Sequence, residues 1–136
     1  MRITDKIEEI EGYAQELSEI LPENMEEYRD LKTRAACERY FEKIIGAVVD
    51  LSFLIIENMS LKIPEEDKES FDILSEKKII SKELAEKLKE AKGMRNIIAH
   101  EYGTIDDEIV FDSITQELGR EVKEFIRQIK KIEELK

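Results

Sequence analysis

The sequence predicts an all-α fold, an up-and-down bundle of about five helices with a long second helix. Apolar side chains recur every three or four residues, and no segment shows the two-residue alternation of a strand. Hydrophobic residues make up 41% and charged residues 40% of the 136 residues. This balance is typical of a folded chain with a charged surface. Residues 1–136 contain no linker, so we expect one domain with its own core.

The first helix is expected over residues 4–20, where an apolar stripe at helical spacing ends before Pro22. Asn24 precedes Glu27 by three positions, the spacing of a capping box. This pair predicts the start of a second helix, which we expect to run unbroken over residues 25–58.

Residues 44–56 of that second helix are apolar on nearly every side. A helix of this kind is buried on several faces, either at the centre of the bundle or at a subunit interface as well. From this stretch we predict a homodimer. It is too short to span a bilayer, and the acidic start of the chain does not resemble a signal peptide, so we expect a cytoplasmic protein without a membrane partner. Cys37 is the only cysteine and is expected to be a small buried side chain.

Three further helices are expected over residues 65–76, 81–101 and 106–134. Ser81 is the predicted N-cap of the fourth helix, and Gly103 is expected to end it in a left-handed conformation.

The net charge of −11 argues against broad binding of long nucleic acid, which usually requires a basic face. A small basic cleft for a few nucleotides, or a basic protein partner, remains compatible with this charge.

The fourth helix has an arginine where its apolar seam calls for an apolar side chain. The seam consists of Leu84, Leu88, Ala91 and Ile98, and Arg95 lies at the same spacing, four residues after Ala91 and three before Ile98. A guanidinium cannot be neutralised, so its burial requires a carboxylate, a phosphate or a water-filled cleft. Asp50, the only charge within the apolar stretch of the second helix, is a candidate partner for Arg95 within or across subunits.

The only histidine, His100, follows Asn96 by four positions and precedes Tyr102 by two. Asn96 and His100 therefore share one helix face. Arg95 and His100 differ by roughly 140° around the helix. They converge only if the helix unwinds near its end or if two copies line one cleft.

Each of these residues also has an ordinary structural explanation. Arg95 alone is more often the partner of a carboxylate, and Asn96 can bind backbone near a helix end. His100 can cap the helix, and Tyr102 can be a core aromatic. Their gathering within eight residues makes a functional site about as plausible as these separate roles.

Other chemistries fit the sequence less well. One histidine and one cysteine do not form a structural zinc site without many carboxylates. The sequence has neither a glycine-rich phosphate loop nor a serine nucleophile elbow. We therefore expect no metal and no cofactor.

The string RNIIAHEY, residues 95–102, matches the Arg, four residues, His, one residue, Tyr motif of the HEPN superfamily. The chain resembles the HepT-type toxins that pair with minimal nucleotidyltransferase antitoxins. The segments RAACERYFEKIIGAVVDLS and GTIDDEIVFDSITQEL are similar to that family as well. The resemblance covers nearly the whole chain and implies one HEPN-like domain over residues 1–136. Gly103 departs from the family, in which a bulky residue is usual.

The resemblance implies a homodimeric, metal-independent endoribonuclease toxin of a type VII-like toxin–antitoxin pair, with two motifs facing one cleft. His100 would act as general acid or base while the RNA 2′-hydroxyl attacks the adjacent phosphate. Arg95 would bind the phosphate oxygens, and Asn96 would orient the imidazole or contact the phosphate. The cognate antitoxin would adenylylate Tyr102 and so silence the enzyme.

The sequence is also compatible with two alternatives to a ribonuclease. The first is a non-catalytic helical dimer that binds a nucleotide or a nucleotidyltransferase partner. The second is a purely structural dimerisation module.

Overall fold

The structure, a computed structural model, describes residues 2–100 and 106–132, and only the backbone of His100. All regular secondary structure in these ranges is helical, which confirms the predicted all-α class. The elements are α1 (Ile3–Ile20), α2 (Met25–Tyr28), α3 (Leu31–Asn58), α4 (Asp67–Glu76), α5 (Lys82–His100), α6 (Asp107–Asp112), the π-helical segment η1 (Ser113–Glu117) and α7 (Leu118–Lys130).

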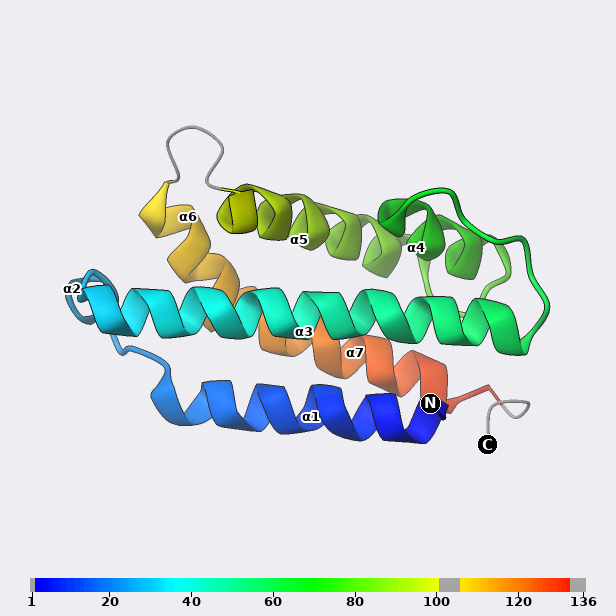
Figure 1. The fold of residues 1–136 in the computed structure, drawn as a ribbon, viewed down its shortest axis with the longest axis horizontal. Helices are drawn as coiled ribbons and strands as arrows, with labels where there is room; N and C mark the ends of the chain where they lie inside the picture. Colours follow the sequence, from blue (N-terminus) through cyan, green and yellow to red (C-terminus); the bar gives the residue numbers. More distant parts are fainter. Residues whose placement is uncertain (1, 101–105, 133–136) are drawn as a thin grey trace.

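Helix α3 is the central element of the bundle (Figure 1). It packs against α1, α4 and α5, while α5 also packs against α4 and α7. Both α1 and α5 run antiparallel to α3, which gives the up-and-down arrangement (Figure 1). The first residues of α3, the last turn of α5, α2 and α6 lie at one end of the bundle. The start of α1 and the end of α7 lie at the other end (Figure 1).

The apolar stretch of α3 forms the centre of this core. Nine of its side chains are less than a tenth exposed: Ile44, Ile45, Ala47, Val48, Val49, Leu51, Ser52, Ile55 and Ile56. The chain's own helices cover them, so their burial requires no second subunit. Of the two explanations for this stretch, the structure supports the centre of the bundle, and the homodimer stays a prediction. Cys37 is also buried, as expected.

The second helix, predicted as continuous, is in fact two helices. The predicted cap at Asn24 is confirmed, since its side chain accepts a 2.9 Å hydrogen bond from the Glu27 N–H. One turn later the chain bends, and Asp30 becomes the N-cap of α3. Its carboxylate accepts hydrogen bonds from the N–H and the hydroxyl of Thr33, both at 3.1 Å. An aspartate side chain that bonds a backbone N–H three residues later favours the non-helical N-cap conformation over a position inside a helix. This preference of Asp30 explains the break between α2 and α3.

The last helix is also less regular than predicted. Asp106 caps α6, accepting a 3.0 Å hydrogen bond from the Glu108 N–H, but η1 then interrupts the α-helical ladder. In η1, the Thr115 hydroxyl donates to the Phe111 carbonyl at 2.7 Å. Such side-chain bonds to the preceding turn compete with regular helix geometry. The expected stop at Gly103 lies outside the described residues.

Within the described ranges, no helix is both long enough and apolar enough to cross a membrane.

Candidate functional site

The frame of the site is α5, which is fixed at its start by two hydrogen bonds. Ser81 is its N-cap as predicted, because the Leu84 N–H donates to the Ser81 hydroxyl at 3.1 Å. The Ser81 N–H in turn donates to the side-chain oxygen of Gln128 on α7 at 2.8 Å. The predicted seam is buried along the helix: Leu84, Leu88, Ala91 and Ile98 are each less than a tenth exposed.

Arg95 lies half-buried on this seam, with its guanidinium against α3. A Cβ built on Gly46 would lie 3.8 Å from Nη2 of Arg95. The Nε atom of Arg95 is buried and has no hydrogen-bond partner among the described residues. Since an arginine stays charged, this guanidinium keeps a strong tendency to bind an anion.

The expected pairing of Asp50 with Arg95 inside one chain is wrong. Asp50 instead lies 3.5 Å from the ammonium of Lys6 on α1, and its side chain is 64% exposed. It follows Gly46 by one helical turn and reaches α1, whereas α5 packs elsewhere on α3. A contact with Arg95 across subunits stays a prediction.

Asn96 is held by a buried lysine that the sequence reasoning missed. The Lys92 ammonium donates to Oδ1 of Asn96 at 2.7 Å and lies 3.3 Å from a carboxylate oxygen of Asp67, the first residue of α4. The signal available in the sequence was the four-residue spacing of Lys92 and Asn96 on one helix face. Asn96 is therefore linked through Lys92 to Asp67 on α4, whereas the Arg95 guanidinium lies beside α3.

His100 is the last residue of α5, four residues after Asn96. Its side chain and the whole of Tyr102 lie outside the described residues. The structure thus brings Arg95, Asn96 and the end of α5 to one end of the bundle. The expected convergence of Arg95 and His100 stays a prediction.

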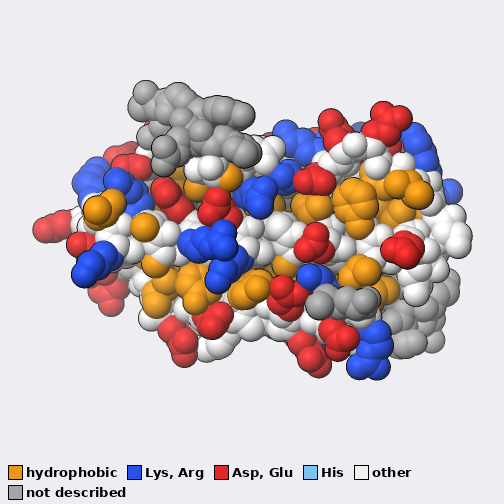
Figure 2. Space-filling view, viewed as in Figure 1, with side chains coloured by type: hydrophobic (Ala, Val, Ile, Leu, Met, Phe, Trp, Pro, Cys, Tyr) orange, Lys and Arg blue, Asp and Glu red, His pale blue; other side chains and the backbone are white. Residues whose placement is uncertain are grey.

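Charges of both signs cover the face of the molecule seen in Figure 2. Lysine and arginine side chains alternate there with aspartate and glutamate, and apolar side chains lie between them (Figure 2). This face therefore offers no continuous basic surface for a long nucleic acid.

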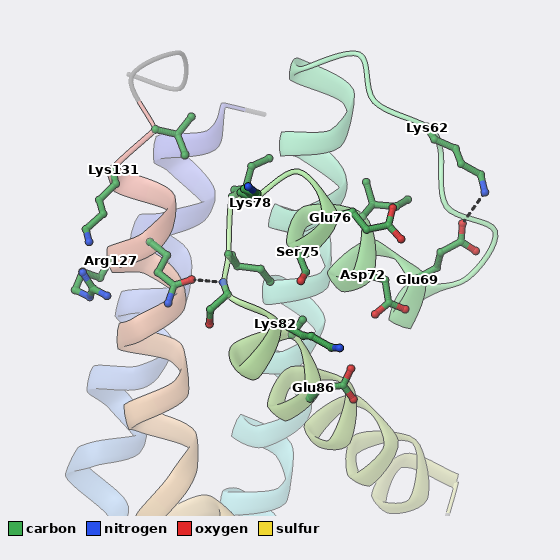
Figure 3. A pocket seen from close by; sticks show the side chains of 17 residues that line it. Lys62, Glu69, Asp72, Ser75, Glu76, Lys78, Lys82, Glu86, Arg127 and Lys131 are labelled. Atoms are coloured by element: carbon green, nitrogen blue, oxygen red, sulfur yellow. Dashed lines mark hydrogen bonds and ion pairs between the residues drawn. The ribbon is translucent and has the colours of Figure 1, made fainter.

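A cavity of about 970 Å³ lies far from the motif, where α4, the start of α5 and the end of α7 meet (Figure 3). Arg127 and Lys131 line it on one side, and Asp72 and Glu76 on the other (Figure 3). The wall between them includes the Ser81–Gln128 hydrogen bond. Ligand sites are usually apolar with few polar groups. This open, mixed-charge hollow is therefore a weaker candidate than the motif.

A second hollow, of about 710 Å³, separates α5 from η1 and α7. Burial, together with the neighbouring charge of Glu117, raises the pKa of Glu121 there to about 7. Glu83, Glu90 and Glu124 line the same hollow. Its acidic character disfavours phosphate, so it does not extend an RNA-binding surface. Among the described residues, no group of three or more His, Cys, Asp and Glu side chains could hold a metal ion.

Comparison with known proteins defines the class of this bundle. The profile of the ribonuclease HepT-like family matches residues 3–129. The chain is 30% identical over 135 residues to a candidate RNase of Archaeoglobus fulgidus, across 97% of this chain and 96% of the relative. It is 24% identical over 128 residues to the mRNA nuclease HepT of Shewanella oneidensis, across 94% of this chain and 96% of the relative. The chain therefore belongs to the ribonuclease HepT-like family.

A solved structure shows the same fold. The tri-AMPylated HEPN toxin of Shewanella oneidensis, in complex with an MNT antitoxin, superposes with a TM-score of 0.89 at 24% identity, over 96% of this chain and 97% of the toxin chain. At this identity the likeness concerns the fold alone. It confirms the HEPN-like helical architecture expected from the motif at residues 95–102.

Proposed function

We propose that residues 1–136 form a single domain that acts in the cytoplasm as the endoribonuclease toxin of a type VII-like toxin–antitoxin pair. Family membership and the nuclease names of the relatives support a ribonuclease. The observation that carries the proposal is Arg95, a half-buried arginine whose Nε is buried without a hydrogen-bond partner among the described residues. An arginine held in this way is suited to bind a phosphate.

In this proposal Arg95 binds the non-bridging oxygens of the scissile phosphate. Its Nη2 lies beside Gly46 of α3, where a built Cβ would be 3.8 Å away, so the guanidinium lies next to α3 before RNA arrives. A preorganised donor stabilises the charge that develops on phosphate at little cost of reorganisation.

His100 moves the protons of the reaction. The RNA 2′-oxygen forms a bond to phosphorus while its proton passes to a base, and the bond from phosphorus to the 5′-oxygen breaks as that oxygen gains a proton. The products are a 2′,3′-cyclic phosphate and a 5′-hydroxyl. An imidazole, with a reference pKa of about 6.5, can serve in either transfer near neutral pH. No step requires a metal ion.

A homodimer would allow two motifs to face one cleft. Three large apolar side chains are exposed at the motif end of the bundle, at the start of α3, within the motif and on α6: Leu31 at 69%, Ile97 at 43% and Ile109 at 56%. Exposed apolar side chains at one end of a molecule favour a protein contact there. Light scattering tests this, since a 16.0 kDa monomer would contradict a dimer.

The partner in this proposal is a minimal nucleotidyltransferase antitoxin that adenylylates Tyr102. The support is the motif resemblance and the AMPylated state of the Shewanella oneidensis toxin. An adenylyl group adds an anionic phosphate two residues after His100. That phosphate would compete with RNA for Arg95 and so silence the enzyme.

Cleavage of mixed tRNA and mRNA in EDTA, by wild type and by His100→Ala, tests the proposal. Intact mass must first show that the wild type carries no adenylyl group. Cleavage by the wild type alone, leaving cyclic phosphate ends, is the expected result. If unmodified wild type fails to cleave, the alternative of a non-catalytic dimer that binds a nucleotide or a nucleotidyltransferase is favoured.

A further inference from the structure

Lys92 is a buried charge one helical turn before the motif. It is 6% exposed, and its ammonium bonds Oδ1 of Asn96 at 2.7 Å and lies 3.3 Å from Asp67. Burying an ammonium is unfavourable unless other groups replace its water. Asp67 supplies the opposite charge, and the Asn96 amide supplies the closest contact.

This contact determines which way the Asn96 amide is turned. An ammonium has only hydrogen-bond donors, so the carbonyl oxygen of the amide must face Lys92. The amide NH₂ group is then directed away from Lys92. Lys92, Asn96 and His100 follow one another at four-residue spacing on one helix face. The amide is therefore placed to act as a donor on the side of the motif.

We propose that Lys92 is a positioning residue of the cleavage site, which holds Asn96 as a hydrogen-bond donor to the scissile phosphate. The inference rests on the proposed ribonuclease function and selects between two roles for Asn96. An amide whose oxygen is engaged by Lys92 is poorly placed to accept a hydrogen bond from the histidine ring. A phosphate oxygen, in contrast, accepts from the free NH₂ group.

Lys89 provides a matched control on the same helix. Its ammonium lies 2.9 Å from Asp72, so it also joins α5 to α4, but its contacts are with Asp72 and Glu86 and not with Asn96. Lys89→Met removes an ion pair between the same two helices without releasing the amide. Any effect specific to Lys92→Met then comes from Asn96.

The test is a double-mutant cycle on kcat for RNA cleavage. Loss of one donor to a developing phosphate charge predicts a decrease of about 100-fold for Asn96→Ala. Misplacing that donor predicts a decrease of up to about 100-fold for Lys92→Met, with a smaller change in KM. The double variant should be no slower than Asn96→Ala, and Lys89→Met should match the wild type. Wild-type kcat in Lys92→Met, or effects that multiply in the double variant, would overturn the inference.

Asn96→Asp tests the direction of the hydrogen bond without disturbing the fold. Its carboxylate keeps an oxygen for Lys92 but offers another oxygen, in place of NH₂, to the phosphate. We expect kcat to decrease at least as much as in Asn96→Ala. Wild-type activity in Asn96→Asp would show that no donor is needed.

A readout that does not depend on cleavage separates the two proposals. The chain has three asparagines, Asn24, Asn58 and Asn96, so selective ¹⁵N labelling gives a simple set of side-chain amide signals. Lys92→Met should shift one pair of signals, and Lys89→Met should shift none. If this occurs while the wild type cleaves no RNA, the proposed function fails and the anchoring of Asn96 stands. If no signal shifts, the anchoring fails even when RNA is cleaved.

Discussion

Replacing Arg95 by methionine should abolish RNA cleavage and at the same time stabilise the fold. The variant removes the proposed phosphate ligand but keeps an unbranched side chain of similar reach. Methionine adapts to irregular apolar space, and the position lies on the apolar seam of α5. Function and stability are therefore expected to change in opposite directions.

The magnitude follows from the environment of the guanidinium. The Nε atom is buried without a hydrogen-bond partner among the described residues, and a buried donor of this kind costs about 1–3 kcal/mol. The side chain as a whole is only half-buried, so we take the lower end of this range. A gain of about 1 kcal/mol raises Tm by about 4 °C in a domain of this size.

Thermal and urea unfolding of the wild type and Arg95→Met, followed by circular dichroism, measure this change. Arg120→Met is the matched control, because Arg120 is exposed on α7; its replacement should leave cleavage unchanged and alter stability by no more than about 0.5 kcal/mol. If Arg95→Met is less stable than the wild type by more than about 1 kcal/mol, the guanidinium has a structural role. If Arg95→Met cleaves RNA at the wild-type rate, Arg95 is not the phosphate ligand.

Three further predictions concern positions around the core. Gly46→Ala should raise the free energy of unfolding by about 0.5–1 kcal/mol, because alanine favours helix. It should keep activity, because its Cβ would lie 3.8 Å from Nη2 of Arg95, an ordinary contact distance. The larger side chain of Gly46→Leu should displace the guanidinium and lower cleavage. Tyr28→Phe should stabilise by about 1 kcal/mol in urea unfolding, because its buried hydroxyl has no partner among the described residues. Burial raises the pKa of Glu121 from 4.5 to about 7. Between pH 4.5 and 7 the folded state therefore keeps a proton on Glu121 that the unfolded state has lost. Stability should fall as pH rises from about 4.5 to 7, and Glu121→Gln should have a higher Tm than the wild type at pH 8 and an equal Tm at pH 4.

Each of these predictions has a contradicting outcome. Full cleavage by Gly46→Leu would show that the contact with α3 does not place Arg95. A less stable Tyr28→Phe would reveal a hydrogen bond of the hydroxyl. Equal Tm values of Glu121→Gln and the wild type at pH 8 would mean that water solvates the carboxylate in the hollow between α5 and α7.

The sequence was sufficient for features that depend on near neighbours. The helical class, the caps at Asn24 and Ser81, the seam of α5 and the place of Arg95 on it all follow from spacings of three or four residues. These spacings reflect the geometry of a single helix, and packing did not alter them. The break at Asp30 was missed because a capping aspartate and a helix-interior aspartate look alike in the sequence.

Only the tertiary structure decided which partners meet the charges of the site. Three features of the site join segments distant in the sequence. They are the ion pair of Asp50 with Lys6, the position of Arg95 beside Gly46, and the link from Asp67 through Lys92 to Asn96. No periodicity within one helix specifies which residue of another helix will face it. That choice is set by how α1, α3, α4 and α5 pack together, since a buried charge must find its partner among the groups that packing brings within reach.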